Sequence, residues 1–215
     1  MGNEINDTNA VAEQAPKARP RKVTQAQDAQ AQILDAIDEL FYREGARAVG
    51  VDAIVKRAGV NKMSLYRQFA SKDALMLHYL AGREARFWKY FDASVAKHPG
   101  KPREQLQQVF VDMAERVGRP GYRGCPFVNI AVEFPDPAHP VRGVVAENKK
   151  QLMARLLKLA TQAGARDPQA LADGAALLIE GGYTATQTYA PGHPLIAALP
   201  QVAAAMIATA CDAAD

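Results

Sequence analysis

The sequence has few cysteines and no segment with the pattern of a β-strand. Cys125 and Cys211 are its only cysteines in 215 residues, too few and too far apart for a disulfide framework or a cysteine-based metal site. Such sparse use is typical of a reducing compartment, so we expect a cytoplasmic protein. No stretch rich in Val, Ile and Thr alternates apolar and polar residues, so strands are not expected.

The sequence also lacks the motifs that accompany catalysis. Its histidines, His78, His98, His139 and His193, are scattered and form no HExxH motif or His and Glu pair. It contains no GxSxG nucleophile elbow, no GxxxxGK[ST] phosphate loop and no GxGxxG after a strand. We therefore expect no catalytic residue, no metal site and no cofactor.

Neither export nor membrane insertion is indicated. The first ten residues, MGNEINDTNA, are polar and lack the apolar run of a signal peptide. The most apolar region, Leu195 to Cys211, is interrupted by Pro200 and Gln201 and is shorter than the roughly 20 residues of a membrane span. We interpret this region as a buried or interface helix.

Charge is nearly balanced over the whole chain but not locally. The 26 Lys and Arg against 23 Asp and Glu leave a net charge of +3, too little to indicate a nucleic-acid partner. Residues 53–72, however, hold five basic residues and no acid, and residues 17–22, KARPRK, hold four and no acid. The excess of positive charge is therefore concentrated near the N-terminus.

A polar segment precedes a series of helical patterns. Residues 1–25 show no apolar period and predict a disordered basic tail. Four helices are then indicated by apolar stripes, caps and stops. The first carries Ile33, Ile37, Leu40 and Phe41 and stops at Gly45; the second is VDAIVKRA, stopping at Gly59; the third is capped by Asn61; the fourth is capped by Ser71 and ends near Ala96.

Five more helices are predicted after the break at HPGKP. They are expected at about Pro102–Val117, Cys125–Glu133, Ala138–Gln162, Pro168–Tyr189 and Pro194–Cys211. The predicted class is all-α with about nine helices, in one or two domains.

The second and third helices form a helix-turn-helix pattern. Only AGVN separates them, and Gly59 suits the tight turn. With Leu65 and Phe69 facing inward, the third helix presents basic, apolar and aromatic side chains outward, which is the chemistry of a helix in the DNA major groove. These side chains are Lys62, Met63, Tyr66 and Arg67. The alternative is an ordinary solvated helix face.

A family resemblance favours the DNA-binding interpretation. The run ILDAIDELFYREGARAVGVDAIVKRAGVNKMSLYRQFASKDAL, residues 33 to 75, resembles the N-terminal DNA-binding domain of the TetR family of bacterial transcriptional regulators. It matches ILxAAxxLFxxxG, IAxxAGVSxGTLYxHF and SKxxL in one register without gaps. The resemblance implies a helix-turn-helix domain over residues 26–72, with three N-terminal helices, and a helical ligand-binding and dimerisation domain over residues 73–215.

The resemblance also implies roles for individual residues. Val51 to Ala58 becomes the supporting helix and Asn61 to Phe69 the recognition helix. Tyr66 and Lys72 are expected to contact phosphates, and the remaining DNA-binding candidates to face base edges or backbone. These candidates are Asn61, Lys62, Met63, Ser64 and Arg67.

The chain departs from the family pattern in two places. Val49 and Gly50 stand where the family commonly has a Thr that caps the second helix and touches phosphate, and Met63 replaces a small Gly. The preferred bases therefore cannot be carried over. The basic segment KARPRK is expected either to lie along phosphates or in a minor groove, or to act as a solubilising tail.

The C-terminal region is expected to form the dimer, since in this family the last two long helices usually pair with those of a second subunit. Small residues that permit close helix approach, Gly174, Gly181 and Gly182, and an apolar stripe support this expectation. The stripe consists of Leu195, Leu199, Val202, Met206 and Ile207. The alternative is a monomer that buries both surfaces in its own core.

A small-molecule site, if present, is expected among the middle helices. Its candidates combine apolar walls with a few polar groups, as ligand sites do, although each could instead be a core residue. They are Trp88, Phe91, Phe110, Met113, Phe127, Asn129, Glu133 and Tyr183. Cys125, beside Arg123, is either a redox-sensing thiol or a buried structural cysteine.

The resemblance implies a ligand-responsive repressor. The predicted protein binds a palindromic double-stranded DNA operator as a homodimer and is released by a small-molecule effector of unknown identity, without a membrane partner. Two alternatives stay open: a helical small-molecule carrier or enzyme with an unused N-terminal motif, and a helical adaptor that binds proteins.

Overall fold

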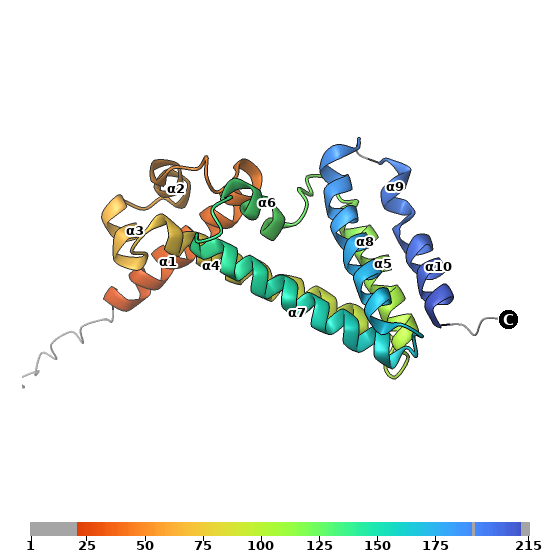
Figure 1. Ribbon diagram of the computed structural model, residues 1–215. Helices are drawn as coiled ribbons and strands as arrows, with labels where there is room; N and C mark the ends of the chain where they lie inside the picture. Colours follow the sequence, from red (N-terminus) through yellow and green to blue (C-terminus); the bar gives the residue numbers. More distant parts are fainter. Residues whose placement is uncertain (1–20, 191, 212–215) are drawn as a thin grey trace, which may run out of the picture.

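The computed structural model describes residues 21–190 and 192–211, and within these ranges every regular element is a helix (Figure 1). The predicted all-α class is confirmed. The helices are α1 (Arg21–Glu44), α2 (Val51–Ala58), α3 (Lys62–Gln68), α4 (Lys72–Ala96), α5 (Pro102–Val117), α6 (Pro126–Glu133), α7 (Pro140–Gln162), α8 (Pro168–Thr188), α9 (Pro194–Ala197) and α10 (Leu199–Cys211).

Two predicted boundaries differ from the structure. Helix α1 begins at Arg21, so residues 21–25 of the predicted disordered tail are helical, while residues 1–20 lie outside the described residues. The single helix expected from Pro194 to Cys211 is two, the four-residue α9 and α10, which meet at Ala198. Pro200 fits this break because proline, which lacks an N–H, is tolerated in the first turn of a helix.

The first three helices and the start of α4 enclose a small core of their own. Ile33 and Ile37 of α1 and Ile54 of α2 are fully buried, as is Leu65 of α3. Helices of eight and seven residues are too short to be stable alone, so this packing keeps α2 and α3 folded.

Local capping fixes where these short helices begin and end. Gly59 adopts the left-handed conformation, φ +67°, that ends α2. The Asn61 side chain accepts a hydrogen bond from the Ser64 N–H at 2.8 Å, and the Ser71 hydroxyl accepts one from the Ala74 N–H at 3.1 Å. Both caps predicted from the sequence are therefore present.

Helices α4 and α7 extend side by side from the N-terminal region to the opposite end of the molecule, where α5, α8 and α10 pack together (Figure 1). Here Gly182 of α8 allows a close approach, because a Cβ at this position would lie 2.8 Å from Cε of Met113 on α5. At Gly174 a Cβ would lie 2.8 Å from Sδ of Met206 on α10. These two glycines thus serve contacts within the chain.

By length and composition alone, the stretch Pro194–Cys211 is apolar enough to cross a membrane, and 22% of it is buried. The sequence interruption had argued against such a span. One side of α10 faces the core, through Leu199, Ala203, Ile207 and Cys211. Other residues of the predicted stripe, Leu195 and Val202, are exposed.

Candidate functional site

The outer surface of α3 carries the side chains that the sequence pattern placed there. Leu65 is buried in the N-terminal core, and Phe69, the residue that ends the helix, is buried beside it. Lys62, Tyr66 and Arg67 are exposed, and Met63 is 72% exposed. A Met so exposed has no role in the core of the chain, so this surface is available to a partner.

Several of these polar groups already have partners within the chain. Lys62 forms an ion pair with Asp52 at 2.7 Å, and its hydrogen bond to this carboxylate raises the pKa of Lys62. The amide oxygen of Asn61 is engaged in capping α3, and Arg67 donates a 3.4 Å hydrogen bond to the Ser64 hydroxyl. A bound phosphate would have to compete with Asp52 for Lys62.

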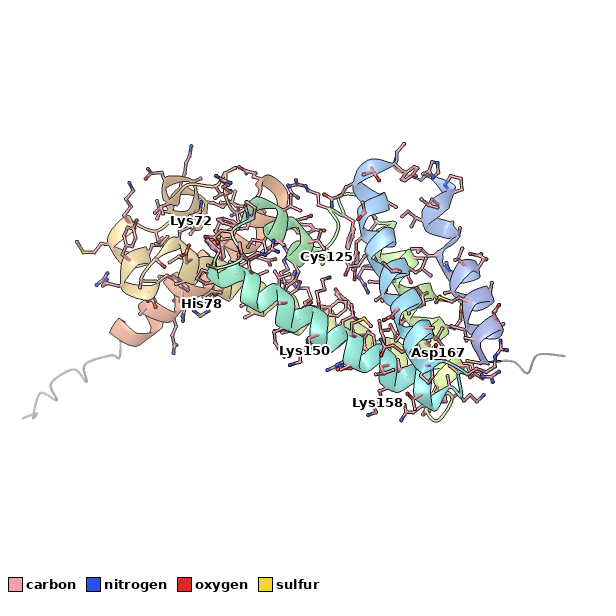
Figure 2. All side chains as sticks on the ribbon, viewed as in Figure 1. Lys72, His78, Cys125, Lys150, Lys158 and Asp167 are labelled. Atoms are coloured by element: carbon pink, nitrogen blue, oxygen red, sulfur yellow. The ribbon has the colours of Figure 1, made fainter. Side chains whose placement is uncertain are left out.

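Lys72 lies at the start of α4, facing the loop before α2 (labelled in Figure 2). Its Nζ donates a 3.0 Å hydrogen bond to the carbonyl of Arg47, and partial burial lowers the pKa of Lys72. This lysine therefore joins α4 to that loop in addition to being a candidate phosphate contact.

The start of α2 explains one departure from the family pattern. Val49 is buried in the N-terminal core, where a polar Thr would need a hydrogen-bond partner. Gly50 is the N-cap of α2, and no side chain caps the helix. The family pattern leads one to expect a capping hydroxyl here. Instead, Val49 packs in the apolar core, and Gly50 begins α2 without a side-chain cap.

A second feature is a cavity of about 90 Å³ where α1, α4, α5, α6, α7 and α8 meet. Cys125, just before α6 and labelled in Figure 2, is one of the residues that line it. Its aromatic walls come from Tyr42, Phe87, Tyr90, Tyr122, Phe127 and Tyr183. Its other functional groups come from Arg83, Arg86, Arg116, Asn148 and Lys149.

Burial controls the ionisation of several cavity groups. It raises the pKa of Tyr122 and of Tyr183, so both phenols remain protonated at neutral pH. It also raises the pKa of the Cys125 thiol, although Lys149 Nζ lies 3.7 Å from the sulfur. A protonated thiol is a poor nucleophile, which favours the structural interpretation of Cys125 over the redox-sensing one.

Helix α6 connects this cavity to the helix-turn-helix. Glu133, its last residue, accepts a 2.6 Å hydrogen bond from the backbone N–H of Arg47, and the Arg47 side chain donates to the Glu133 carbonyl at 3.2 Å. Gly45 fits beside this carboxylate only because it lacks a Cβ, which would lie 2.9 Å from Glu133 Oε1, and its φ is +93°.

The loop before α6, at the other end of this helix, contacts α1. The backbone N–H of Arg123 donates to the Tyr42 hydroxyl at 2.7 Å, and that hydroxyl donates to the Gly124 carbonyl at 3.3 Å. The Arg123 side chain donates to the carbonyls of Tyr42 and Arg43. The loop before α6 is thus attached to α1 at the wall of the cavity.

Two sequence families match this chain. Residues 33–79 match bacterial regulatory proteins of the tetR family, and residues 96–202 match the tetracyclin repressor-like C-terminal domain. The transcriptional regulator AcuR of Cereibacter sphaeroides is 30% identical over 179 residues, which are 79% of this chain and 81% of AcuR. The chain belongs to the TetR family. It is a DNA-binding transcriptional regulator.

Other relatives agree with this assignment. A TetR-family transcriptional regulator from Streptomyces coelicolor superposes with a TM-score of 0.82 at 28% identity, covering 86% of this chain and 97% of that one. The transcriptional activator FasR of Mycolicibacterium smegmatis is 47% identical over 49 residues, 23% of this chain and 22% of FasR. The short match to FasR concerns only part of each protein.

The candidate ligand residues of this TetR-family chain are dispersed. Phe127 and Tyr183 line the cavity, while Phe91 and Met113 line a void of about 10 Å³ shared with Arg116 and Tyr183. Phe110 is fully buried core.

The other three candidates are held by contacts elsewhere. Trp88 packs against Phe87 and Phe91 and under the guanidinium of Arg155, which is 4.0 Å from its ring centroid. The Asn129 amide donates to the Arg123 carbonyl at 2.8 Å. Glu133 binds the loop before α2, as described above.

The sequence interpretation overlooked the charged side chains of the cavity and all of its tyrosines except Tyr183. Arg83 and Arg116, for example, were not singled out because each lies in a predicted helix without a motif. One signal could have found them: Arg83 lies between Leu80 and Phe87 at helical spacing, and Arg116 follows Met113 by three. A charge within an apolar stripe indicates a functional cavity or a buried ion pair.

No metal site is evident in residues 21–190 and 192–211, where no group of three or more His, Cys, Asp or Glu side chains is placed to hold an ion.

Proposed function

We propose that this protein is an effector-responsive repressor that binds a palindromic operator as a homodimer in the cytoplasm. The observation that carries the proposal is the shared use of α6 and its preceding loop: Gly124 and Phe127 line the cavity, while Glu133 holds the loop before α2. A molecule in the cavity therefore touches the segment on which the helix-turn-helix rests. The proposal assigns no catalytic role.

In this proposal α3 enters the major groove. Met63 and Arg67 are the side chains best exposed for base edges, with Lys62 and Ser64 at the groove edge or backbone. Tyr66 and Lys72 contact phosphates, and Asn61 fixes the start of the helix through its cap. An apolar Met favours contact with a thymine methyl group.

The outer faces of α8 and α10 support dimerisation. Leu177 is 74% exposed and Val202 is 51% exposed, although both are large apolar residues. A groove of about 700 Å³ runs beside Val202 and Met206 on this face. Contact between two copies would remove this apolar surface from water and present two α3 helices to two half-sites.

Release of the operator requires two conformations. The effector has to bind the conformation that fits DNA poorly more tightly than the one that fits it well, because equal affinity for both shifts nothing. Changing the ratio of the two states from 1:99 to 99:1 takes about 5.5 kcal/mol of differential affinity. Movement of α6 against α1 would couple effector binding to the position of the loop before α2.

The decisive experiment is selection of bound DNA from random sequence by the purified full-length protein, followed by a compound screen for release. We expect enrichment of one site with two inverted halves, and its loss from the protein in the presence of an effector. Arg67→Ala should weaken binding to that site by about 1–3 kcal/mol and relax the preference at one position in each half.

Contrary outcomes separate the parts of the proposal. Enrichment of a single, non-repeated half-site would contradict the palindromic operator. A reporter gene behind the selected site that is expressed only when the protein is present would replace repression with activation.

A further inference from the structure

The cavity between α1 and the middle helices is lined by four cations and, within the described residues, by no carboxylate. Three of the cations have a carboxylate partner outside the lining, although two of them share one carboxylate. Arg83 and Arg86 both pair with Asp38, at 2.8 Å and 3.2 Å, and Lys149 pairs with Glu180.

Arg116 differs from the other three. No carboxylate of the described residues lies within ion-pair distance of it, and Glu115, its neighbour on α5, pairs with Arg119 at 2.8 Å. Its recorded contacts are the Tyr183 hydroxyl, at 3.5 Å, and the ring of Tyr90, whose centroid is 5.1 Å away. A half-buried guanidinium without a counter-charge is unfavourable, and a bound anion would remove this cost.

Two phenols stand beside Arg116 with hydrogens to donate. The Tyr183 hydroxyl accepts from Arg116, which leaves its own O–H unused, and within the described residues the Tyr122 hydroxyl makes no hydrogen bond. The two rings are stacked, with centroids 6.3 Å apart and planes 22° from parallel. A guanidinium and two phenols form a set of donors that matches an ionised carboxylate, which only accepts.

Part of the remaining lining is apolar, and the space is small. Phe87, Phe127 and Leu152 supply walls without polar atoms. The volume of about 90 Å³ is below the roughly 150 Å³ of an engineered cavity that holds benzene. The enclosed part of the site therefore suits a small occupant.

We propose that the effector is a short-chain monocarboxylate whose carboxylate is bound by Arg116, Tyr122 and Tyr183 and whose hydrocarbon part lies against Phe87, Phe127 and Leu152. This inference rests on the proposed function, because it takes the cavity as the effector site. Among the described residues, Arg116 without an anion contacts the Tyr183 hydroxyl and the face of Tyr90. With one, α5, α8 and the loop at Tyr122 are drawn together next to Tyr42 of α1.

The test is calorimetric titration of the full-length protein with acetate, propionate, butyrate and isobutyrate. Propionamide, butyramide and isobutyramide serve as uncharged ligands of nearly the same shape, and inorganic phosphate as an anion without a hydrocarbon part. We expect the best carboxylate to bind at least tenfold more tightly than its amide and more tightly than phosphate.

Variants test whether Arg116 is the cation that binds the carboxylate. Arg116→Met should weaken the best carboxylate by on the order of 10- to 100-fold, as expected for loss of a charge-assisted hydrogen bond, and leave its amide unchanged. Arg116→Lys should retain part of the preference. Arg119→Met is the matched control, since Arg119 lies one turn further along the chain, is exposed and pairs with Glu115. Thermal unfolding of each variant shows whether it is folded.

The outcomes distinguish this inference from the proposed function. Equal binding of acid and amide, an unchanged preference in folded Arg116→Met, or no binding of any carboxylate would overturn the carboxylate site. Equal binding of phosphate would overturn the need for a hydrocarbon part. Operator release by a neutral compound that is unaffected by Arg116→Met would support the effector response but contradict a carboxylate effector. Carboxylate binding without operator release would support the carboxylate site but contradict the effector response.

Discussion

The outer surface of α3 and the cavity differ in how their residues are brought together. The exposed side chains of α3 lie between residues 62 and 67, on one helix with one buried side. The cavity side chains come from positions as far apart as Tyr42 and Tyr183, on six helices. A surface of the first kind follows from helix periodicity, whereas one of the second kind depends on how helices pack.

The two regions meet at the loop between α1 and α2. Glu133 and Lys72 both bind Arg47 of this loop, through its N–H and its carbonyl. The locally specified surface of α3 is thus supported by contacts between residues far apart in the chain, and the proposed regulation would act through these contacts.

The largest expected effect separates the two sides of α3. Leu65→Ala removes a fully buried side chain and should lower the free energy of unfolding by about 2–5 kcal/mol. Met63→Ala, two residues away and exposed, should change it by less than about 0.5 kcal/mol. Urea denaturation measures both. Similar losses for the two variants would mean that α3 is oriented differently.

A substitution on α8 tests the proposed dimer surface, which α8 and α10 form together. Leu177→Glu places a charge in the proposed contact between copies and should weaken dimerisation by roughly 2 kcal/mol or more. Sedimentation at several protein concentrations measures this change. Val132→Glu, on α6, is the control, since Val132 is 75% exposed and also apolar. A dimer equally stable in both variants would place the interface elsewhere.

The junction between the regions is tested at Gly45. Gly45→Ala forces a non-glycine residue to φ +93° and a methyl group against Glu133, and should cost about 1–2 kcal/mol of stability. Gly50→Ala is the comparison: Gly50 has φ −84°, and a Cβ there meets nothing within 4 Å, so it should cost less than Gly45→Ala. If thermal denaturation showed that Gly50→Ala destabilises the protein more than Gly45→Ala, the close packing of Gly45 against Glu133 would be contradicted.

The smallest effect concerns the missing cap of α2. Gly50→Thr supplies a hydroxyl where the backbone is already extended, φ −84° and ψ 160°, and should stabilise the protein by a few tenths of a kcal/mol. If that hydroxyl also reaches phosphate, affinity for the selected operator rises at low salt. A fall in stability would show that the side chain cannot adopt the capping conformation.

The fold was predictable because most of its signals are local. The apolar stripe of α1, the caps Asn61 and Ser71 and the stop at Gly59 each act within a few residues, and each is present in the structure. The beginning of α1 was misplaced because residues 21–25 lack an apolar side. The break at Ala198 was overlooked because the apolar composition continues through it.

The exposed surface of α3 was predictable from the sequence, whereas the cavity was not. Every DNA-binding candidate follows from the helix-turn-helix pattern and the family resemblance, and the structure exposes Lys62, Met63, Tyr66 and Arg67 together. The ligand candidates were chosen by residue type, which does not distinguish a cavity wall such as Tyr183 from packed core such as Phe110. Glu133 shows the difference most clearly, since its carboxylate lies against the helix-turn-helix.

The sequence by itself determined the class of the protein, the positions of its main helices and the exposed chemistry of α3, because these depend on contacts within a few residues and on side-chain periodicity. Only the tertiary structure decided that, within the part of the chain it describes, Arg116 stands beside two phenols without a carboxylate partner, and that α6 holds the loop before α2. Such arrangements join residues many positions apart, and no local pattern specifies which helices will meet.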